Sequence, residues 1–245
     1  MNREKVTIST KDGQCTAHFL TPDGKGPWPG VIFYMDAFGI RPAMLEMAAH
    51  LASGGYAVLL PDLFFRFGPY GPLAPKEVLA GNPGAVIGPM MATTDNHKTG
   101  TDTAAFLDFL SSRSEVAGIK VGTVGFCMGG GMALTAAGFY PDRVAAAVSF
   151  HGGSLATDLP VSPHLLAPKI KAELYVAGAD NDHGYPPEMA ERLEKALTDA
   201  GVKHRCEIYT GKYHGWMKPD MPVYDAAAAE RGWRELFALY ARTLK

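Results

Sequence analysis

Short, continuously apolar runs alternate along the chain with longer segments in which apolar residues recur at helical spacing. The short runs predict buried strands, because turn-favouring residues bound them, and the longer segments predict helices. Strands are expected at residues 6–10, 15–20, 30–35, 56–60, 119–124, 144–150, 172–176 and 204–209. Helices are expected at residues 41–53, 75–80, 101–112, 132–137, 187–200 and 224–244.

This alternation predicts an α/β fold with a mostly parallel central sheet and helices on both faces. Such a sheet binds ligands beyond the carboxyl ends of its strands. The Gly- and Pro-rich segment 61–98 interrupts the pattern, and long connections of this kind often carry function. No repeat, linker or low-complexity tract divides the chain, so a single domain spanning residues 1–245 is expected.

Composition and charge argue against several classes of protein. The formal net charge of −2 gives no indication of binding to nucleic acid or to an anionic membrane. No apolar run approaches the roughly 18 residues of a membrane span, and residues 1–8 lack the apolar core of a secretory signal. Cys15, Cys127 and Cys206 are too widely spaced for a disulfide framework or a zinc motif, so a reducing, cytoplasmic setting is expected.

Cys127 stands between glycines at a strand-to-helix junction. The segment Gly125–Gly130 follows the strand predicted at 119–124 and precedes the helix predicted at 132–137. A reactive side chain on such a turn is the nucleophile elbow of α/β-hydrolases, and glycine neighbours permit the close backbone approach. The pattern therefore predicts the α/β-hydrolase fold and a cysteine nucleophile, in a position where serine is more usual.

The chain order of three reactive residues supports this prediction. A nucleophile, an acid and a histidine follow one another as Cys127, Asp180 and His214, which is the order of the α/β-hydrolase triad. His214 is expected to accept the thiol proton, and Asp180 to fix the imidazole tautomer. Asp180 is preferred to its neighbour Asp182 because it directly follows the end of a predicted strand.

Backbone amides near the nucleophile complete the predicted chemistry. The N–H of Met128 and one from Ala37 or Phe38 are expected to hold the developing oxyanion. The start of the helix after Cys127 contributes partial positive charge, which favours the thiolate.

The chain resembles the dienelactone hydrolase (carboxymethylenebutenolidase) family over nearly its whole length. The motifs that carry the resemblance are Gly125–Gly130, Gly178–Asp180, Tyr213–Trp216, Asp36–Gly39, Pro61–Leu63 and Pro186–Pro187. The resemblance implies hydrolysis of an enol-lactone or other ester through an acyl-thiol intermediate, with no metal and no cofactor. The expected partner is a small-molecule ester or lactone, and the sequence leaves open a monomer or a small homo-oligomer.

The resemblance also implies binding roles. Asp36 stands where the family usually has a glutamate that helps to manage the thiol proton. Lys218 stands where the family has an arginine for a substrate carboxylate, and Arg66 is the candidate for a second anion-binding arginine. Phe38 and Trp216 lie within the motifs and complete the predicted substrate-binding set. The departures at Asp36 and Lys218 favour a relative that acts on a different ester.

Two other classes of function are alternatives to hydrolysis. A nicotinamide-dependent oxidoreductase is disfavoured, because Gly122–Gly129 does not supply the spacing G-x-G-x-x-G. A non-catalytic ligand-binding protein on a hydrolase scaffold is the alternative, since a fold alone does not fix function. Each binding residue also has an alternative interpretation: Asp36 as a cap of the helix predicted at 41–53, and Lys218 and Arg66 as solvated surface charges.

Overall fold

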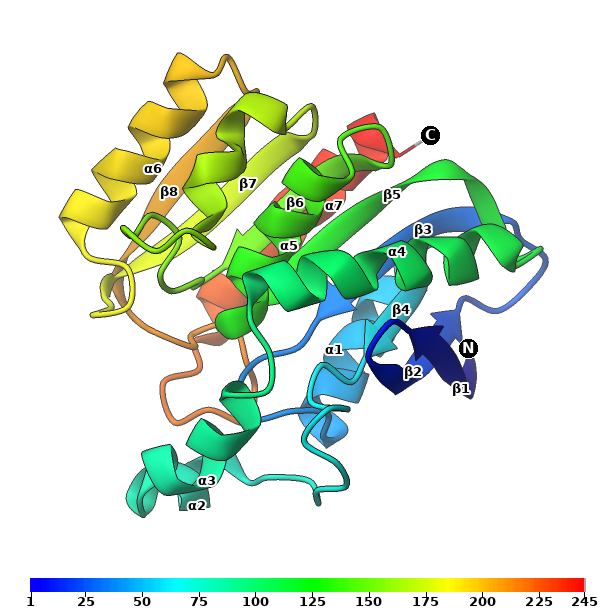
Figure 1. Cartoon of the computed structure of the whole chain (residues 1–245), viewed down its shortest axis with the longest axis horizontal. Coiled ribbons are helices and arrows are strands. Elements are labelled where there is room, and N and C mark those ends of the chain that lie inside the picture. Colours follow the sequence, from blue (N-terminus) through cyan, green and yellow to red (C-terminus); the bar gives the residue numbers. More distant parts are fainter. Residues whose placement is uncertain (245) are drawn as a thin grey trace.

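A computed structural model describes residues 1–244 and places eight strands in one sheet, in the order β1-β2-β4-β3-β5-β6-β7-β8 (Figure 1). The strands are β1 (Asn2–Thr10), β2 (Gly13–Thr21), β3 (Trp28–Tyr34), β4 (Ala57–Pro61), β5 (Val116–Phe126), β6 (Val144–Phe150), β7 (Glu173–Asn181) and β8 (His204–Tyr213). β1 and β2 form an antiparallel hairpin and β2 runs antiparallel to β4, whereas every pair from β4 to β8 is parallel. The predicted mostly parallel sheet is thereby confirmed.

Helices cover both faces of this sheet, as predicted. They are α1 (Pro42–Ser53), α2 (Pro75–Ala80), α3 (Pro83–Met91), α4 (Asn96–Ser112), α5 (Met128–Phe139), α6 (Pro187–Asp199), α7 (Ala226–Thr243) and the 3₁₀ helix η1 (Pro163–Lys169). α4, α5 and α6 lie on one face, and α1 and α7 lie on the other (Figure 1). The second pair is in direct contact, with the rings of His50 and Trp233 4.7 Å apart.

The segment 61–98 contains more helix than its composition predicts. Helix α3 was not expected, and Asn82 caps it by accepting a hydrogen bond from the amide of Ala85 at 3.2 Å. Helix α4 begins at Asn96 rather than near residue 101, because the Asp95 carboxylate accepts the Lys98 amide at 2.7 Å. A cap set by one short side chain moves a helix start without changing the apolar pattern that follows it.

The parallel strands bring four reactive residues to one edge of the sheet. β3, β5, β7 and β8 end at Tyr34, Phe126, Asn181 and Tyr213. The residues that follow include Asp36, Cys127, Asp182 and His214, which therefore meet beyond the carboxyl ends of the strands. The segment 61–98 reaches the same edge, where Val78 of α2 packs with Phe38 and Met221. No helix within residues 1–244 is long and apolar enough to cross a membrane.

Candidate active site

The turn that carries Cys127 has a backbone conformation that side chains rarely adopt. Cys127 lies between β5 and α5 with φ of 57° and ψ of −119°. A Cβ atom on Gly125 would stand 1.8 Å from the carbonyl oxygen of Gly129, and a Cβ on Gly129 would stand 2.4 Å from the carbonyl oxygen of Tyr34. The glycines are thus required by the close approach of three backbone segments. Such strain persists where the surrounding structure enforces it, and it is concentrated at functional sites.

Hydrogen bonds from the backbone amide hold Cys127 in place at the elbow. The amide of Cys127 donates to the carbonyl of Phe150 at 3.1 Å and to Nδ1 of His151 at 3.2 Å. The side chain is half-buried and stands at the N-terminus of the 12-residue helix α5. Unpaired amides and the helix dipole at that end favour an anion.

His214 lies between the thiol and a buried carboxylate. Its Nδ1 atom is 2.7 Å from Oδ2 of Asp182, whose side chain is only 2% exposed. The other oxygen of Asp182 accepts the amide of Gly184 at 2.8 Å, so the carboxylate is held on both sides. Because Nδ1 donates to Asp182, Nε2 is the ring nitrogen left to bond with Cys127.

The protonation states follow from these contacts. Burial raises the pKa of the Cys127 thiol, but the hydrogen bond and positive charge of His214, with the charge of Lys218, outweigh it and hold this pKa below its ordinary value. Burial lowers the pKa of His214, but its hydrogen bonds to Asp182 and Cys127 outweigh burial and raise this pKa. The pair is therefore favoured as thiolate and imidazolium.

The structure does not place Asp180, the predicted triad acid, beside His214. Its exposed carboxylate accepts the amides of Gly211 and Lys212 at 2.8 and 3.0 Å, away from His214. The register of β7 and β8 shifts at this point, from Ala179 opposite Tyr209 to Asn181 opposite Tyr213. The shift leaves amides of β8 without strand partners, and Asp180 accepts them while Asp182 takes the position beside His214.

Two amides predicted to hold an oxyanion stand at the elbow and at the end of β3. Met128 is the first residue of α5, so its N–H has no intrahelical partner. The amide of Phe38 is used internally, because it donates to Oδ1 of Asp36 at 2.9 Å. Between the alternatives Ala37 and Phe38, this leaves the amide of Ala37 for a ligand.

A sequence model of the dienelactone hydrolase family matches residues 15–244. The chain belongs to this family. A Synechocystis protein provisionally named a carboxymethylenebutenolidase is 26% identical over 245 residues, which cover 98% of this chain and 96% of that protein. Membership confirms the resemblance and identifies the chain as an enzyme of the lactone and ester hydrolase class.

Solved structures agree with the fold over the full chain. Dienelactone hydrolase from Anabaena variabilis matches with a TM-score of 0.70 and 21% identity, covering 100% of this chain and 99% of that one. A dienelactone hydrolase-like promiscuous phosphotriesterase from metagenomic libraries matches with a TM-score of 0.79 and 25% identity, again covering 100% and 99%. The predicted α/β-hydrolase fold is confirmed.

Within this dienelactone hydrolase family member, Asp36 belongs to a buried network of charges. Its carboxylate accepts two hydrogen bonds from Arg41, at 2.7 and 3.0 Å, and one from Nζ of Lys218 at 2.6 Å. Arg41 also binds Asp220, at 2.6 Å through Nε. Burial raises the pKa of Asp36, but Lys218 and Arg41 outweigh it and hold this pKa below its ordinary value. The charges of Arg41 and Lys218 therefore balance those of Asp36 and Asp220, and Asp36 stays ionised.

The predicted substrate-binding set does not assemble around Cys127. Lys218 is fully buried and paired with Asp36, so its ammonium is not free to meet a carboxylate. Arg66 is paired with Asp12 and Asp102, both at 2.7 Å, which neutralise its charge. Each of these two cations thus has an internal carboxylate partner, a feature that sequence spacing does not show.

The two aromatic residues of that set are packed into the protein. Trp216 is fully buried and stacks on Tyr209 with ring centroids 4.3 Å apart. Phe38 is 5% exposed and lies beneath Lys218, whose Nζ is 5.3 Å from the ring centroid. Trp216 supports the base of the site, and only Phe38 retains an exposed edge.

His151 belongs to the site although it lies outside the predicted triad and its motifs. It follows β6 with φ of 40°, is fully buried, and its ring centroid lies 5.3 Å from that of His214. Burial and the charges of His214 and Lys218 hold the pKa of His151 well below its ordinary value. A neutral His151 whose Nδ1 accepts the Cys127 amide carries its proton on Nε2. His151 therefore stabilises the elbow by accepting a hydrogen bond from the backbone amide of Cys127.

Proposed function

We propose that this enzyme hydrolyses carboxylic esters or lactones through an acyl-thiol on Cys127, with His214 and Asp182 completing the triad. The observation that supports the proposal best is the line Asp182–His214–Cys127, which ends at a strained elbow on the N-terminus of α5. This line contains each part that thiol catalysis needs: a lowered thiol pKa, a base within reach and a buried acid that orients the base.

Acylation begins with the thiolate. The sulfur of Cys127 attacks the carbonyl carbon, and the carbonyl electron pair moves to oxygen. The amides of Met128 and Ala37 donate hydrogen bonds to this oxyanion. When the tetrahedral intermediate collapses, the C–O bond to the leaving group breaks. The imidazolium of His214 gives its proton to the departing alkoxide, and the acyl group remains on sulfur as a thioester.

Deacylation reverses these roles. His214, now neutral, accepts a proton from water, and the hydroxide attacks the thioester carbonyl. The C–S bond breaks, the carboxylic acid leaves, and the thiolate and imidazolium are restored. Asp182 keeps the imidazole in one tautomer throughout and stabilises its charged form.

The charge balance of the site favours an uncharged acyl group. Both cations predicted to bind a carboxylate, Lys218 and Arg66, are neutralised by internal carboxylates. An anionic substrate would have to displace Asp36 from a buried ion pair, and breaking such a pair is strongly unfavourable. We therefore propose a neutral ester or lactone as substrate.

The setting of the enzyme follows from its thiols. Cys15, Cys127 and Cys206 are free, which supports the proposed reducing, cytoplasmic location. The continuous eight-stranded sheet supports the proposal that residues 1–245 act as one domain.

A chromogenic aryl ester tests the activity and its nucleophile together. Wild-type protein should release the phenol, and rapid quenching should trap a chain heavier by one acyl group, mapped to the Cys127 peptide. Cys127→Ala should lose turnover by about 10³-fold or more while remaining folded, and Cys15→Ala serves as the control thiol. A wild-type protein that binds the ester without hydrolysing it would instead establish the non-catalytic alternative.

The substrate class is tested separately with two aryl esters matched in size. One carries a neutral acyl group and the other a terminal carboxylate. The proposal expects a higher kcat/KM for the neutral ester. A higher kcat/KM for the carboxylate ester would overturn the neutral substrate and leave the cysteine mechanism in place.

A further inference from the structure

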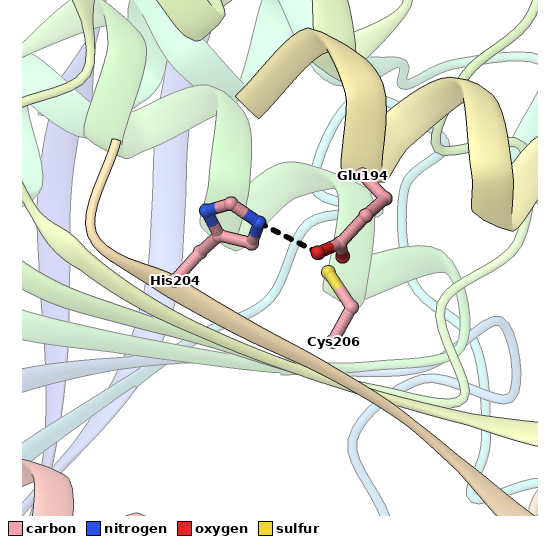
Figure 2. A group of neighbouring side chains, drawn as sticks. All are labelled: Glu194, His204 and Cys206. Carbon is pink, nitrogen blue, oxygen red and sulfur yellow. Dashed lines mark hydrogen bonds and ion pairs between the residues drawn. The ribbon is translucent and has the colours of Figure 1, made fainter. Parts of the chain in front are cut away.

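Three side chains with metal-binding atoms converge away from the active site, between α6 and β8. They are Glu194, His204 and Cys206, whose carboxylate oxygen, imidazole nitrogen and sulfur all lie within 4.8 Å of one another. Figure 2 shows Glu194 reaching down from the helix while His204 and Cys206 rise from the strand toward the same point. One contact is already short, with Nε2 of His204 3.0 Å from Oε1 of Glu194.

The backbone fixes this convergence. His204 and Cys206 are two residues apart on a strand, so their side chains project from the same face. Glu207, the next residue along the strand, faces the opposite side of the sheet, where it pairs with Arg205 and with Arg231 of α7. Leu193 and Leu197 of α6 are buried, which holds the helix over the strand and directs Glu194 toward it. Two regular elements thus present the three ligand atoms.

The tautomer of His204 suits a metal. Its Nδ1 atom lies 2.7 Å from the carbonyl oxygen of Val202. A carbonyl oxygen only accepts, so Nδ1 carries a hydrogen and donates it. Nε2 faces Glu194 and Cys206. Without an ion it donates to the Glu194 carboxylate at 3.0 Å, and a bound ion would take the place of that proton. Metal-binding histidines are commonly fixed in this way by a backbone carbonyl on the other ring nitrogen.

We propose that Glu194, His204 and Cys206 bind a zinc-class divalent cation. A thiolate, an imidazole and a carboxylate form a donor set that zinc accepts, whereas calcium and magnesium prefer oxygen donors. At zinc–ligand distances of about 2.0–2.3 Å, tetrahedral ligands stand about 3.3–3.8 Å apart. The present separations need only a small adjustment, and the Glu194 side chain, 51% exposed, is free to make it.

The site is separate from the hydrolytic centre. His204 begins β8, and His214 directly follows its end. Ten residue steps at about 3.3 Å each would put the two histidines roughly 33 Å apart if the strand were fully extended, and its irregular end shortens that distance only slightly. β8 is the last strand of the sheet and pairs only with β7, so an ion here would clamp α6 to an edge strand. The ion is therefore proposed as a structural one that does not take part in ester hydrolysis.

Cobalt(II) titration of the full-length Cys127→Ala protein tests the proposal, because cobalt reports its ligands and this variant lacks the reactive thiol. The expected result is one ion per chain, with a sulfur-to-cobalt charge-transfer band in the near ultraviolet. Introducing Cys206→Ser should abolish that band, and Glu194→Gln should weaken cobalt affinity by about tenfold or more. Glu191→Gln, an exposed glutamate one turn earlier on α6, is the matched control and should bind as the parent does.

Thermal melting with zinc gives an independent readout. At zinc a hundredfold above its dissociation constant, the melting temperature of the parent should rise by about 5–10 °C. The rise should vanish in Glu194→Gln, whose exposed position does not threaten folding, and persist in Glu191→Gln. The absence of saturable binding, a band that survives Cys206→Ser, or equal behaviour of the two glutamate variants would overturn the site.

Discussion

The Oδ2 atom of Asp182 lies 2.7 Å from Nδ1 of His214, while the carboxylate of Asp180 binds amides of β8. Two aspartates separated by one residue thus have different tasks. Asp180 holds the irregular stretch of β8 just before His214, and Asp182 orients the imidazole itself. The acid of the proposed triad is therefore set by the loop after β7.

Substituting each aspartate separates these tasks. Asp182→Asn should lower kcat for an aryl ester by about 10²–10⁴-fold, because an amide can stabilise neither the required tautomer nor the imidazolium. Asp180→Asn is the matched control, since it makes the same change two residues away. It should leave kcat within about twofold of wild type. Steady-state kinetics on both variants measures these losses of kcat. A larger loss in Asp180→Asn than in Asp182→Asn would make Asp180 the triad acid.

The contrast between the two aspartates shows where prediction from sequence succeeds. The elbow around Cys127 was predictable because its glycines and its strand-to-helix junction are local in the chain. The position of His214 at the same edge of the sheet was predictable from chain order. The acid was not, because a register shift between β7 and β8 decides which carboxylate faces the imidazole. Such shifts depend on pairing between strands, and the amino-acid pattern of one strand does not record them.

Ion pairs between residues far apart in the chain were also not predictable from the sequence. Lys218 and Arg66 were predicted as ligand-binding cations, yet each meets a carboxylate far away in the chain. The cluster of Glu194, His204 and Cys206 was not predicted from the sequence either. Its side chains come from a helix and a strand, and their spacing matches no metal-binding motif. The alternation of strands and helices, by contrast, was predicted well, since the burial of each element follows its own periodicity.

Alkylation should report the ionised thiol. His214 and Lys218 lower the pKa of Cys127, so its thiolate persists below the ordinary thiol pKa of about 8.5. Burial raises the pKa of both Cys15 and Cys206, which keeps them protonated. Limiting iodoacetamide at neutral pH should label the Cys127 peptide first.

The pH dependence of that labelling supplies the mechanistic test. In His214→Ala the hydrogen bond and positive charge are lost while the burial remains, so the pKa of Cys127 should rise. The midpoint of the alkylation rate should move to higher pH, and the rate at neutral pH should fall. An unchanged midpoint in His214→Ala would show that His214 does not activate the thiol.

The elbow glycines should tolerate no side chain. In Gly125→Ala the new methyl group would meet the Gly129 carbonyl at 1.8 Å, and neither backbone can move away. We expect a loss of more than about 4 kcal/mol of unfolding free energy, or no folded protein. Gly84→Ala in α3 is the control, because its new methyl group would meet only the Asn82 side chain, at an ordinary contact distance of 3.6 Å. It should stabilise the protein by about 0.5–1 kcal/mol in thermal unfolding.

Lys218→Met should reveal a structural ion pair. Removing the ammonium leaves the Asp36 carboxylate buried with Arg41 as its remaining cationic partner, and breaking a buried pair in this way typically costs about 3–5 kcal/mol. Urea denaturation should show that loss. Lys195→Met is the matched control: its pair with Asp199 is exposed, so the urea midpoint should hardly move.

Lys218→Arg distinguishes this role from substrate binding. If Lys218 held a substrate carboxylate, arginine would serve as well or better, because its fork matches a carboxylate. Lys218 is instead fully buried, with its side chain close to Gly215 and Phe38, so a larger guanidinium would have to displace these neighbours. Lys218→Arg should therefore lower the urea midpoint through overpacking. A stable Lys218→Arg protein with a reduced KM for carboxylate-bearing esters alone would restore the ligand-binding role.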